Sequence, residues 1–328
     1  MENIFAGKTI LVTGGTGSIG KEIVNQVLQY DINKVVVFSR DEIKHFVLKN
    51  LIVDSRLDTF VGDVRDPSSL ARLFDRYNFD IIYHAAAMKH VVVCENHPHE
   101  CAYTNIFGTQ NVIDAAIRNE VPKLVTISTD KASSPVNVMG CTKYIAETIT
   151  LNANYSCVRF GNVANSRGSV IPIFLDCLVN GTPLTLTDPE VTRFVFKIPD
   201  AVKLVLSATK YSSGGDLFIL KMKAFKLGDL LDVLVNKIVP RLGIDKEQII
   251  INKIGLLPGE KLHEDLLNES ELSRVYEMQD MYVVLKEHES SSRSDLAEIN
   301  LMSYTSSDVE LISKDELESF ILDYLRNK

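Results

Sequence analysis

A short apolar run that turns through three glycines into an amphipathic helix constrains the fold more than any other feature. Residues 8–12 read KTILV, which suits a strand buried on both faces. The turn TGGTGSIG follows, and a helix with apolar residues along one face comes next. This order predicts a dinucleotide site, because glycines allow close backbone approach and a helix N-terminus supplies amides. The expected contacts are Thr13, Gly14, Gly17, Ser18, Ile19 and Gly20.

Further apolar runs alternate with helical segments along the first half of the chain. They lie at residues 34–40, 57–66, 80–87, 123–129 and 155–163, and the last is expected to close the sheet. The alternation predicts an α/β fold, a Rossmann-like doubly wound parallel sheet with ligands at the carboxyl ends of its strands. We expect a cofactor-binding domain at 1–165, to which some later segments return. A smaller mixed α/β region at 166–285 is expected to bind substrate, and 286–328 forms a tail whose helix opens with a capping box, Ser313 to Glu316.

The strand ends carry the candidate cofactor contacts. The second strand ends in Ser39 and Arg40, and a guanidinium there suits a 2′-phosphate, so NADP is favoured over NAD. Asp41 and Glu42 follow directly and weaken this inference. The remaining expected contacts are Asp63 and Val64 with the adenine, and Ala85, Ala86 and Ala87 with the nicotinamide half.

The stretch TDKASSPVNVMGCTKYIAE, residues 129–147, concentrates the candidate chemistry. Asp130 and Lys131 follow an apolar strand, and a helix then carries Met139 and Lys143. Four residues make about one helical turn, so Met139 and Lys143 are expected to share a face. Tyr144, one residue further on, is expected to point elsewhere.

Composition narrows the classes of partner. The net charge is −8, so a global basic field for nucleic acid is absent. The five cysteines form no CxxC, and the histidines lack metal-ligand spacing, so we predict no metal site. We also expect no leader, no membrane span and a reducing cytoplasm. Position alone makes Lys89 a candidate substrate ligand, followed by His90, and turn-rich segments add Arg167 and Arg193.

Longer strings carry a specific resemblance. AAAMKH, TNIFGTQNVIDAA, STDKASSPVN, RFGNVANSRGSVIP, LTLTDPEVTRF and PGEKLHE resemble the UDP-N-acetylglucosamine 4,6-dehydratases of the extended short-chain dehydrogenase/reductase superfamily. The similarity covers roughly residues 5 to 285. It implies a catalytic pair in Asp130 and Lys131 and a nicotinamide-ribose ligand in Lys143. The implied substrate ligands are Lys89, Asn162, Arg167, Arg193 and Glu260.

Two positions depart from the family pattern. Met139 stands where the family has a tyrosine, and Leu257 stands where many relatives have an arginine. The resemblance implies oxidation at carbon 4 of UDP-N-acetylglucosamine, loss of water across carbons 5 and 6, and hydride return to carbon 6. It also implies a homo-oligomer, a dimer or a hexamer.

The residues suggest how the steps divide. We assign Asp130 as the acid, with its pKa raised by burial, and Lys131 as the base, with its pKa lowered by desolvation. As neighbours, they are expected to point in different directions. A thioether cannot take the 4-hydroxyl proton, so Lys143 is favoured, helped by a water beside Met139; Thr129 and Tyr144 are alternatives.

Other functions stay open. A UDP-sugar 4-epimerase shares the first step but needs no elimination pair. A non-catalytic NADP-binding sensor or scaffold would explain the missing tyrosine but not Asp130 and Lys131. The spacing does not fix the stereochemistry at carbon 5, where we lean towards retention.

Overall fold

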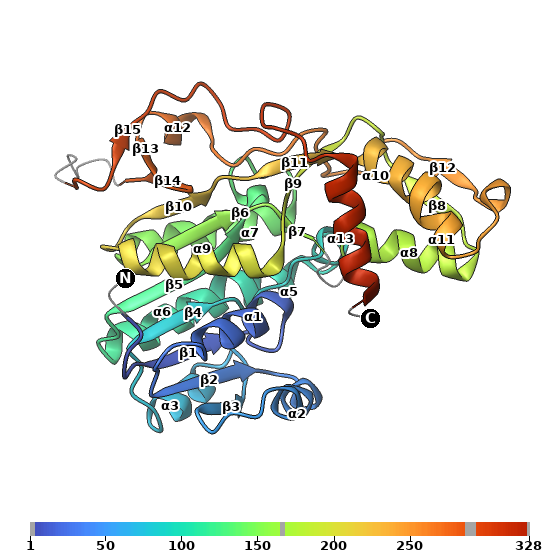
Figure 1. The fold of residues 1–328 in the computed structure, drawn as a ribbon. Coiled ribbons are helices and arrows are strands. Elements are labelled where there is room, and N and C mark those ends of the chain that lie inside the picture. The colour runs from blue at the N-terminus through green and yellow to red at the C-terminus, as the bar shows by residue number, and fades with distance from the viewer. Residues whose placement is uncertain (1–3, 165–167, 286–292, 327–328) are drawn as a thin grey trace.

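The computed structural model describes residues 4–164, 168–285 and 293–326. Its centre is a ten-stranded sheet in the order β15-β13-β14-β10-β6-β5-β4-β1-β2-β3 (Figure 1). Seven neighbouring strands run parallel. They are β1 (Thr9–Thr13), β2 (Lys34–Ser39), β3 (Leu57–Val61), β4 (Ile81–His84), β5 (Lys123–Thr129), β6 (Ser156–Phe160) and β10 (Leu217–Leu220). The predicted Rossmann-like doubly wound sheet is confirmed.

The expectation that the strand at 155–163 closes the sheet is wrong. Strand β10 is buried along its whole length and pairs parallel with β6. The sheet then continues with the antiparallel strands β14 (Met281–Val284), β13 (Val275–Met278) and β15 (Ala297–Glu298). An apolar strand such as LFIL needs cover on both faces and finds it only inside this sheet.

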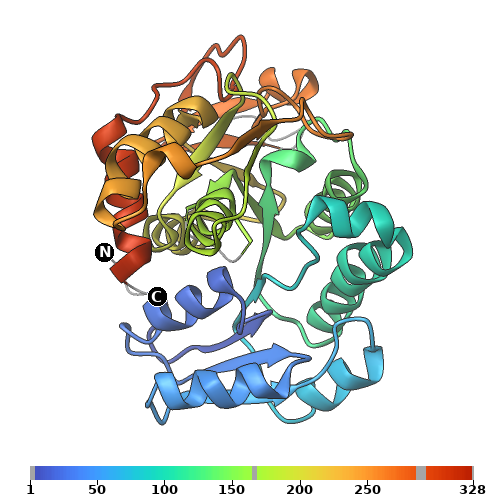
Figure 2. The ribbon, with the colours of Figure 1, turned by 90° about the vertical axis from the view of Figure 1, so that its right-hand side faces the viewer.

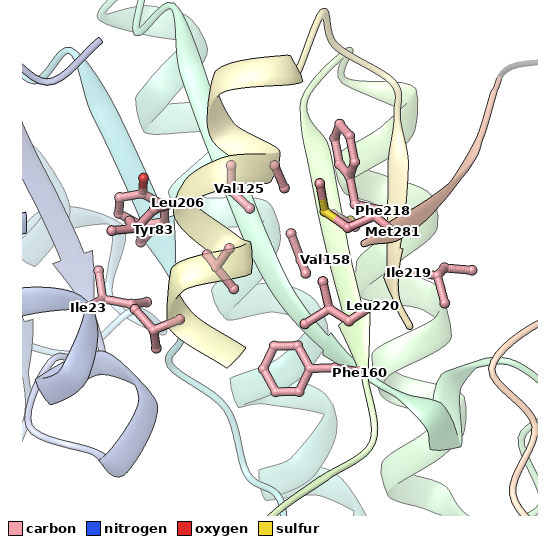
Figure 3. Packing of buried hydrophobic residues seen from close by; sticks show 14 of the residues in the cluster. Ile23, Tyr83, Val125, Val158, Phe160, Leu206, Phe218, Ile219, Leu220 and Met281 are labelled. Atoms are coloured by element: carbon pink, nitrogen blue, oxygen red, sulfur yellow. The ribbon is translucent and has the colours of Figure 1, made fainter. Parts of the chain in front are cut away.

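Alternate residues of the central strands face two different cores. Ile10 and Val12 of β1 pack into one cluster, which also contains residues of α1 (Ser18–Val27) and α9 (Ile198–Tyr211). Leu11 packs into a second cluster with residues of α3 (Pro67–Phe74) and α6 (Gly108–Arg118). Figure 3 shows the first cluster, in which Ile23 and Leu206 from the helices approach Tyr83 and Val125 of the sheet.

The other helices that accompany the ten-stranded sheet include α7 (Val138–Asn152). Helix α7 starts after Asn137, whose side chain accepts a hydrogen bond from the Gly140 amide and so satisfies one of the amide groups that every helix start exposes. The elements are α2 (Glu42–Leu51), α4 (Val91–Asn96), α5 (Pro98–Ala102), η1 (Tyr103–Phe107), η2 (Asp130–Ala132), α7 (Val138–Asn152) and α12 (Glu269–Leu272).

The remaining elements build a separate apolar core. Most of their helices lie on the right-hand side of Figure 1, the side that faces the viewer in Figure 2. Leu317 and Ile321 of the C-terminal helix α13 belong to this core, and α13 packs against α10. The strands are β7 (Asn162–Val163), β9 (Thr192–Phe196) and β11 (Lys223–Lys226) in one sheet, and β8 (Leu184–Leu186) and β12 (Ile251–Lys253) in another. The helices are α8 (Val170–Asn180), α10 (Leu227–Val233), η3 (Leu234–Ile238), α11 (Val239–Arg241), η4 (Lys246–Gln248) and α13 (Lys314–Arg326). The division at residues 165 and 285 stays a prediction.

In the parts of the chain that the structure describes, no helix combines the length and the apolar character that crossing a bilayer requires.

Candidate active site

The glycine turn is packed against the end of β4 so tightly that side chains cannot fit. Gly14 has a φ of +66°, and a Cβ atom placed on it would lie 2.7 Å from the Ala86 nitrogen. A Cβ atom on Gly20 would lie 2.4 Å from the Gly14 carbonyl oxygen. The Gly17 amide donates to that same carbonyl at 2.9 Å, directly before α1 begins. Thr13, Ser18 and Ile19 flank this turn, and the cradle fits the pyrophosphate of a dinucleotide.

A buried histidine joins the turn to the neighbouring strand. His84 Nδ1 lies 2.7 Å from the Thr13 hydroxyl, and its Nε2 lies 3.0 Å from the Thr109 hydroxyl. Thr109 donates its own proton to the Asn105 carbonyl, so it accepts from Nε2–H, and Thr13 donates to Nδ1. Burial, aided by the charge of Lys143, lowers the pKa of His84 to about 3, which keeps the ring neutral.

The predicted 2′-phosphate site is an exposed guanidinium. The Arg40 side chain is 55% exposed and lies 3.8 Å from the Asp63 carboxylate. The Ser39 hydroxyl contacts His45 Nε2 at 2.9 Å. Asp41 caps α2, and its carboxylate also pairs with Lys44 at 2.8 Å. The negative charge of Asp41 is therefore partly compensated by the start of α2 and by Lys44, so Asp41 is a weaker argument against a phosphate beside Arg40.

Asp63 and Val64 are held in place by other groups of the protein. The Asp63 carboxylate accepts from the Arg65 amide at 3.0 Å and from Arg65 Nε at 2.8 Å. The Val64 side chain is buried, and its carbonyl accepts from Asn111 at 3.0 Å. An adenine contact by Asp63 stays a prediction, and it would share this carboxylate with Arg65.

The chain after β4 forms the wall expected for the nicotinamide half. Ala85 and Ala86 are half-buried, and Ala87 is exposed. The Asn105 side chain holds the next residue, Met88, by its amide at 2.8 Å and its carbonyl at 3.0 Å. This clamp fixes the loop that presents Lys89 and His90.

Lys89 and His90 are both exposed, and His90 lies against the segment before α8. A Cβ atom on Gly168 would lie 2.5 Å from the His90 ring. Arg167, the other ligand predicted nearby, lies outside the described residues.

The catalytic pair predicted after β5 is an ion pair, so the expectation that its members point apart is wrong. Asp130 Oδ1 accepts from the Thr129 hydroxyl at 2.8 Å, the Lys131 amide at 2.9 Å and Lys131 Nζ at 3.0 Å. Asp130 Oδ2 is buried, and within the described part of the chain it has no hydrogen-bond partner. Lys131 Nζ also donates to Asn162 Oδ1 at 3.4 Å.

Two predicted residues, Lys131 and Arg193, meet at a third, Glu264, that was not selected from the sequence. Glu264 Oε1 lies 3.3 Å from Lys131 Nζ and 3.7 Å from Arg193 Nε. Arg193 in turn pairs with Glu260 at 2.8 Å. One chain of alternating charges therefore runs from Asp130 to Glu260.

This arrangement overturns the expected pKa of Lys131. Burial works to lower the pKa of the Lys131 ammonium group, but attraction from Asp130 and Glu264 outweighs burial. The pKa is raised above its ordinary value instead of lowered. Lys131 is accordingly a charged ammonium in the protein as described.

Met139 and Lys143 lie on the buried side of α7, as predicted, and Tyr144 is 44% exposed. Met139 packs with Cys94 and Cys101 in a small sulfur-rich apolar cluster. Lys143 Nζ donates to the Ile127 carbonyl at 2.6 Å. Burial lowers the pKa of Lys143, although the Glu147 carboxylate works in the opposite direction. A lysine of this kind can hold a neutral amine more readily than one in water.

Glu264, His84 and Asn105 escaped selection for a common reason. The partners of each lie far away in the sequence, so no local pattern marks it. Glu264 had one usable signal, since it ends the PGEKLHE string, whose Glu260 was selected. His84 had another, since a histidine inside the apolar run DIIYHAAA requires a partner when buried.

Comparison with known proteins places these features in a family. Residues 10–286 match the model of a family described as polysaccharide biosynthesis protein. An uncharacterized membrane protein of Methanocaldococcus jannaschii is 42% identical, over 98% of this chain and 97% of that protein. A Campylobacter jejuni UDP-N-acetylglucosamine 4,6-dehydratase (inverting) is 39% identical, over 86% of this chain and 84% of that protein. A Rickettsia canadensis UDP-glucose 4-epimerase is 37% identical over 85% and 83%.

Solved structures with a similar fold include a close match in sequence and a more distant dehydratase. Pen from Bacillus thuringiensis superposes with a TM-score of 0.90 at 38% identity, covering 98% of this chain and 99% of that one. DesIV of Streptomyces venezuelae, a dTDP-glucose 4,6-dehydratase solved with NAD, gives a TM-score of 0.73 at 20% identity over 97% of each chain and shows the shared fold. The chain therefore belongs to the polysaccharide biosynthesis protein family, with the UDP-N-acetylglucosamine 4,6-dehydratases of the extended short-chain dehydrogenase/reductase superfamily.

Proposed function

We propose that this protein is a lyase that dehydrates UDP-N-acetylglucosamine to a 4-keto-6-deoxy sugar nucleotide for the synthesis of a surface polysaccharide or glycan. The observation that carries the proposal is the ion pair of Asp130 and Lys131, which is joined through Glu264 to Arg193. Elimination of water needs an acid and a base side by side, and a nucleotide diphosphate needs cations. The relative from Campylobacter jejuni, which carries the dehydratase name, supports the same reaction.

The glycine cradle, Thr13 and Arg40 would hold the cofactor, and we favour NADP. A bound nicotinamide would supply reversible hydride transfer, accepting at carbon 4 and returning at carbon 6, with no net redox change. Arg40 supports NADP because its exposed guanidinium suits a 2′-phosphate. NAD is the named ligand of DesIV, so NAD stands as the alternative.

Lys143 is the residue we assign to the first proton. The Met139 thioether neither donates nor accepts a proton usefully, so it serves as an apolar wall. Burial lowers the pKa of Lys143, which brings the neutral amine within reach as a base for the 4-hydroxyl, directly or through a water.

Asp130 and Lys131 then divide the elimination. Lys131 is charged before substrate arrives, so it must lose a proton before it can accept the one on carbon 5. Asp130 is the nearest acceptor, at 3.0 Å. Transfer of that proton gives a neutral amine and a carboxylic acid at once, which are the base and the acid that the step needs. A substrate that excludes water favours this neutral form, because a charged pair loses solvation in a dry site.

A UDP-sugar 4-epimerase is the second candidate, because a relative at 37% identity carries that kind of name. An epimerase has no use for the Asp130 and Lys131 pair, and a non-catalytic NADP-binding sensor or scaffold has no use for it either. Dehydration is therefore the function that the site supports best.

The test is incubation of the protein with UDP-N-acetylglucosamine and NADP. Mass spectrometry should show the loss of one water, with the absorbance of a keto sugar. An unchanged mass over many turnovers would refute the proposal, and a sugar inverted at carbon 4 at the same mass would support the epimerase. NMR of the product then reads the configuration at carbon 5, where retention stays our preference.

The oligomer and the compartment remain proposals as well. We propose a homo-oligomer, either a dimer or a hexamer, that works in the cytoplasm. Sedimentation velocity of the purified protein and fractionation of the cells that make it test the two points separately.

A further inference from the structure

We propose that Glu264 is a positioning residue for the elimination pair, which holds the Lys131 ammonium group and connects it to Arg193. The inference rests on the proposed dehydration and adds to it a residue whose role follows from its contacts.

Glu264 is the shared anion of two cations. Its Oε1 lies 3.3 Å from Lys131 Nζ and 3.7 Å from Arg193 Nε. Only 3% of the residue is exposed, so water cannot replace these partners. Burying a carboxylate costs solvation free energy unless cations or hydrogen-bond donors compensate for it, and two cations lie beside this one.

The backbone of Glu264 is fixed by Ser306, which lies 42 positions further along the chain. The Glu264 amide donates to the Ser306 hydroxyl at 2.9 Å, and the Ser306 amide donates to the Glu264 carbonyl at 2.8 Å. The same hydroxyl lies 2.7 Å from that of Thr192, next to Arg193. The carboxylate is therefore delivered to Lys131 from a rigid support.

Glu264 is one of two carboxylates that pair with Lys131 in the described part of the chain. The charged groups there that act on Lys131 are Asp130 on its own turn, Glu264 and Arg193 of β9. Arg193 opposes the Lys131 charge, and its own charge is paired with Glu260. Neutralising Glu264 leaves Asp130 to balance Lys131 alone, with Arg193 still repelling it. The pKa of Lys131 should then fall by about one to two units, the usual effect of one charge at this range.

The direction of this shift does not depend on the role of Lys131. If the reaction needs the neutral amine, the rate rises with pH through the pKa of Lys131. If it needs the ammonium, the rate falls with pH through the same value. In both cases Glu264→Gln moves this part of the pH–rate profile to lower pH. Whether the rate rises or falls with pH there shows whether the neutral amine or the ammonium of Lys131 is the active form.

The experiment measures Lys131 directly as well as through turnover. Competitive labelling with acetic anhydride across pH, read by mass spectrometry at the peptide that contains Lys131, reports the pKa of the amine without substrate. The side chain is 19% exposed, which lets the reagent reach it. Glu264→Gln, Glu264→Asp and the control Asp265→Asn are compared. Asp265 pairs with Lys261 at 2.7 Å on the same segment.

The expected result is a labelling curve of Lys131 displaced downward by about one to two pH units in Glu264→Gln. Glu264→Asp keeps the charge on a shorter side chain further from Lys131, so its curve should lie between those of wild type and Glu264→Gln, and Asp265→Asn should match the wild type. Curves that coincide in folded Glu264→Gln and wild type would overturn the proposal. If the Gln variant does not fold, a Glu264→Asp curve identical to wild type overturns it.

Turnover separates this inference from the proposed function. A wild type that releases no water from UDP-N-acetylglucosamine refutes dehydration, whatever the labelling shows. A wild type that dehydrates, with a pH profile that Glu264→Gln leaves in place, refutes the role of Glu264 alone.

Discussion

Arg159 offers the sharpest test of what holds helix α7, which carries Met139 and Lys143, in place. It is the largest fully buried side chain of the described residues, and it lies on β6 between α7 and α12. Its guanidinium contacts both oxygens of Glu147, at 3.0 and 2.6 Å, and both of Glu271, at 2.8 and 2.9 Å. Nη1 also donates to the Leu266 carbonyl at 2.8 Å. Glu147 sits one turn beyond Lys143, so this network helps to fix the lysine.

Arg159→Met should therefore be costly, because it leaves two buried carboxylates without their cation. Breaking a buried ion pair from one side costs about 3–5 kcal/mol. For 328 residues, an unfolding entropy of about 2.1 cal/mol/K per residue sums to about 0.7 kcal/mol/K. The melting temperature should accordingly fall by about 4–7 °C.

The assay is thermal unfolding followed by circular dichroism, with a triple variant as the control. Arg159→Met with Glu147→Met and Glu271→Gln removes all three charges together, and it should recover at least half of the loss. Glutamine can still accept the hydrogen bond that the Asn268 amide gives to Glu271. A fall of less than about 2 °C in the single variant, or a triple variant no more stable than the single one, would refute the reasoning.

Four further outcomes are expected. Lys143→Ala should cut hydride transfer at carbon 4 by about 10²–10⁴-fold, measured by the absorbance of reduced nicotinamide, and near-normal rates would sink its role as base. Asp130→Asn or Lys131→Met should still reduce the cofactor but release no water; a product lighter by one water would contradict this. Arg40→Ser should weaken the binding of NADP by about tenfold or more and leave the binding of NAD unchanged, and calorimetry measures both affinities. Burial lowers the pKa of Lys143 and the Glu147 carboxylate opposes that shift. If neutral Lys143 is the base, the hydride-transfer rate should rise with pH through this pKa, and Glu147→Gln should move the rise to lower pH. A pH–rate profile that does not move in Glu147→Gln would contradict the role of Lys143 as the base.

Local patterns predicted the parts of this molecule that depend on near neighbours. The strand, glycine turn and helix at the N-terminus are present, and Met139 and Lys143 share the buried side of α7. The capping box before the last helix is also confirmed, with Ser313 and Glu316 exchanging hydrogen bonds of 2.9 and 3.1 Å. Each of these features follows from periodicity or from bonds within one turn.

Two of the misses involve partners that lie far apart along the chain, and one involves two adjacent residues. The pKa of Lys131 was expected from burial alone, but attraction from Asp130 and from Glu264, which lies 133 positions away, outweighs burial and raises the pKa. Asp130 and Lys131 were expected to point apart because they are neighbours, yet the 3₁₀ turn after β5 lets the lysine fold back onto the carboxylate. Strand β10 was not placed in the parallel sheet, since a short apolar run does not reveal its neighbour.

Ser306 bears on where this protein can be cut. The family match ends at residue 286, yet Ser306 fastens Glu264 to Thr192, and the Tyr304 hydroxyl accepts from the Met222 amide at 2.7 Å. A fragment trimmed to the matched residues would keep the glycine turn and the stretch at 129–147 but lose the segment that braces Glu264. The residues shared with relatives therefore do not mark the smallest fragment that keeps Glu264 in place. That fragment must also include the segment around Ser306, which lies beyond the family match.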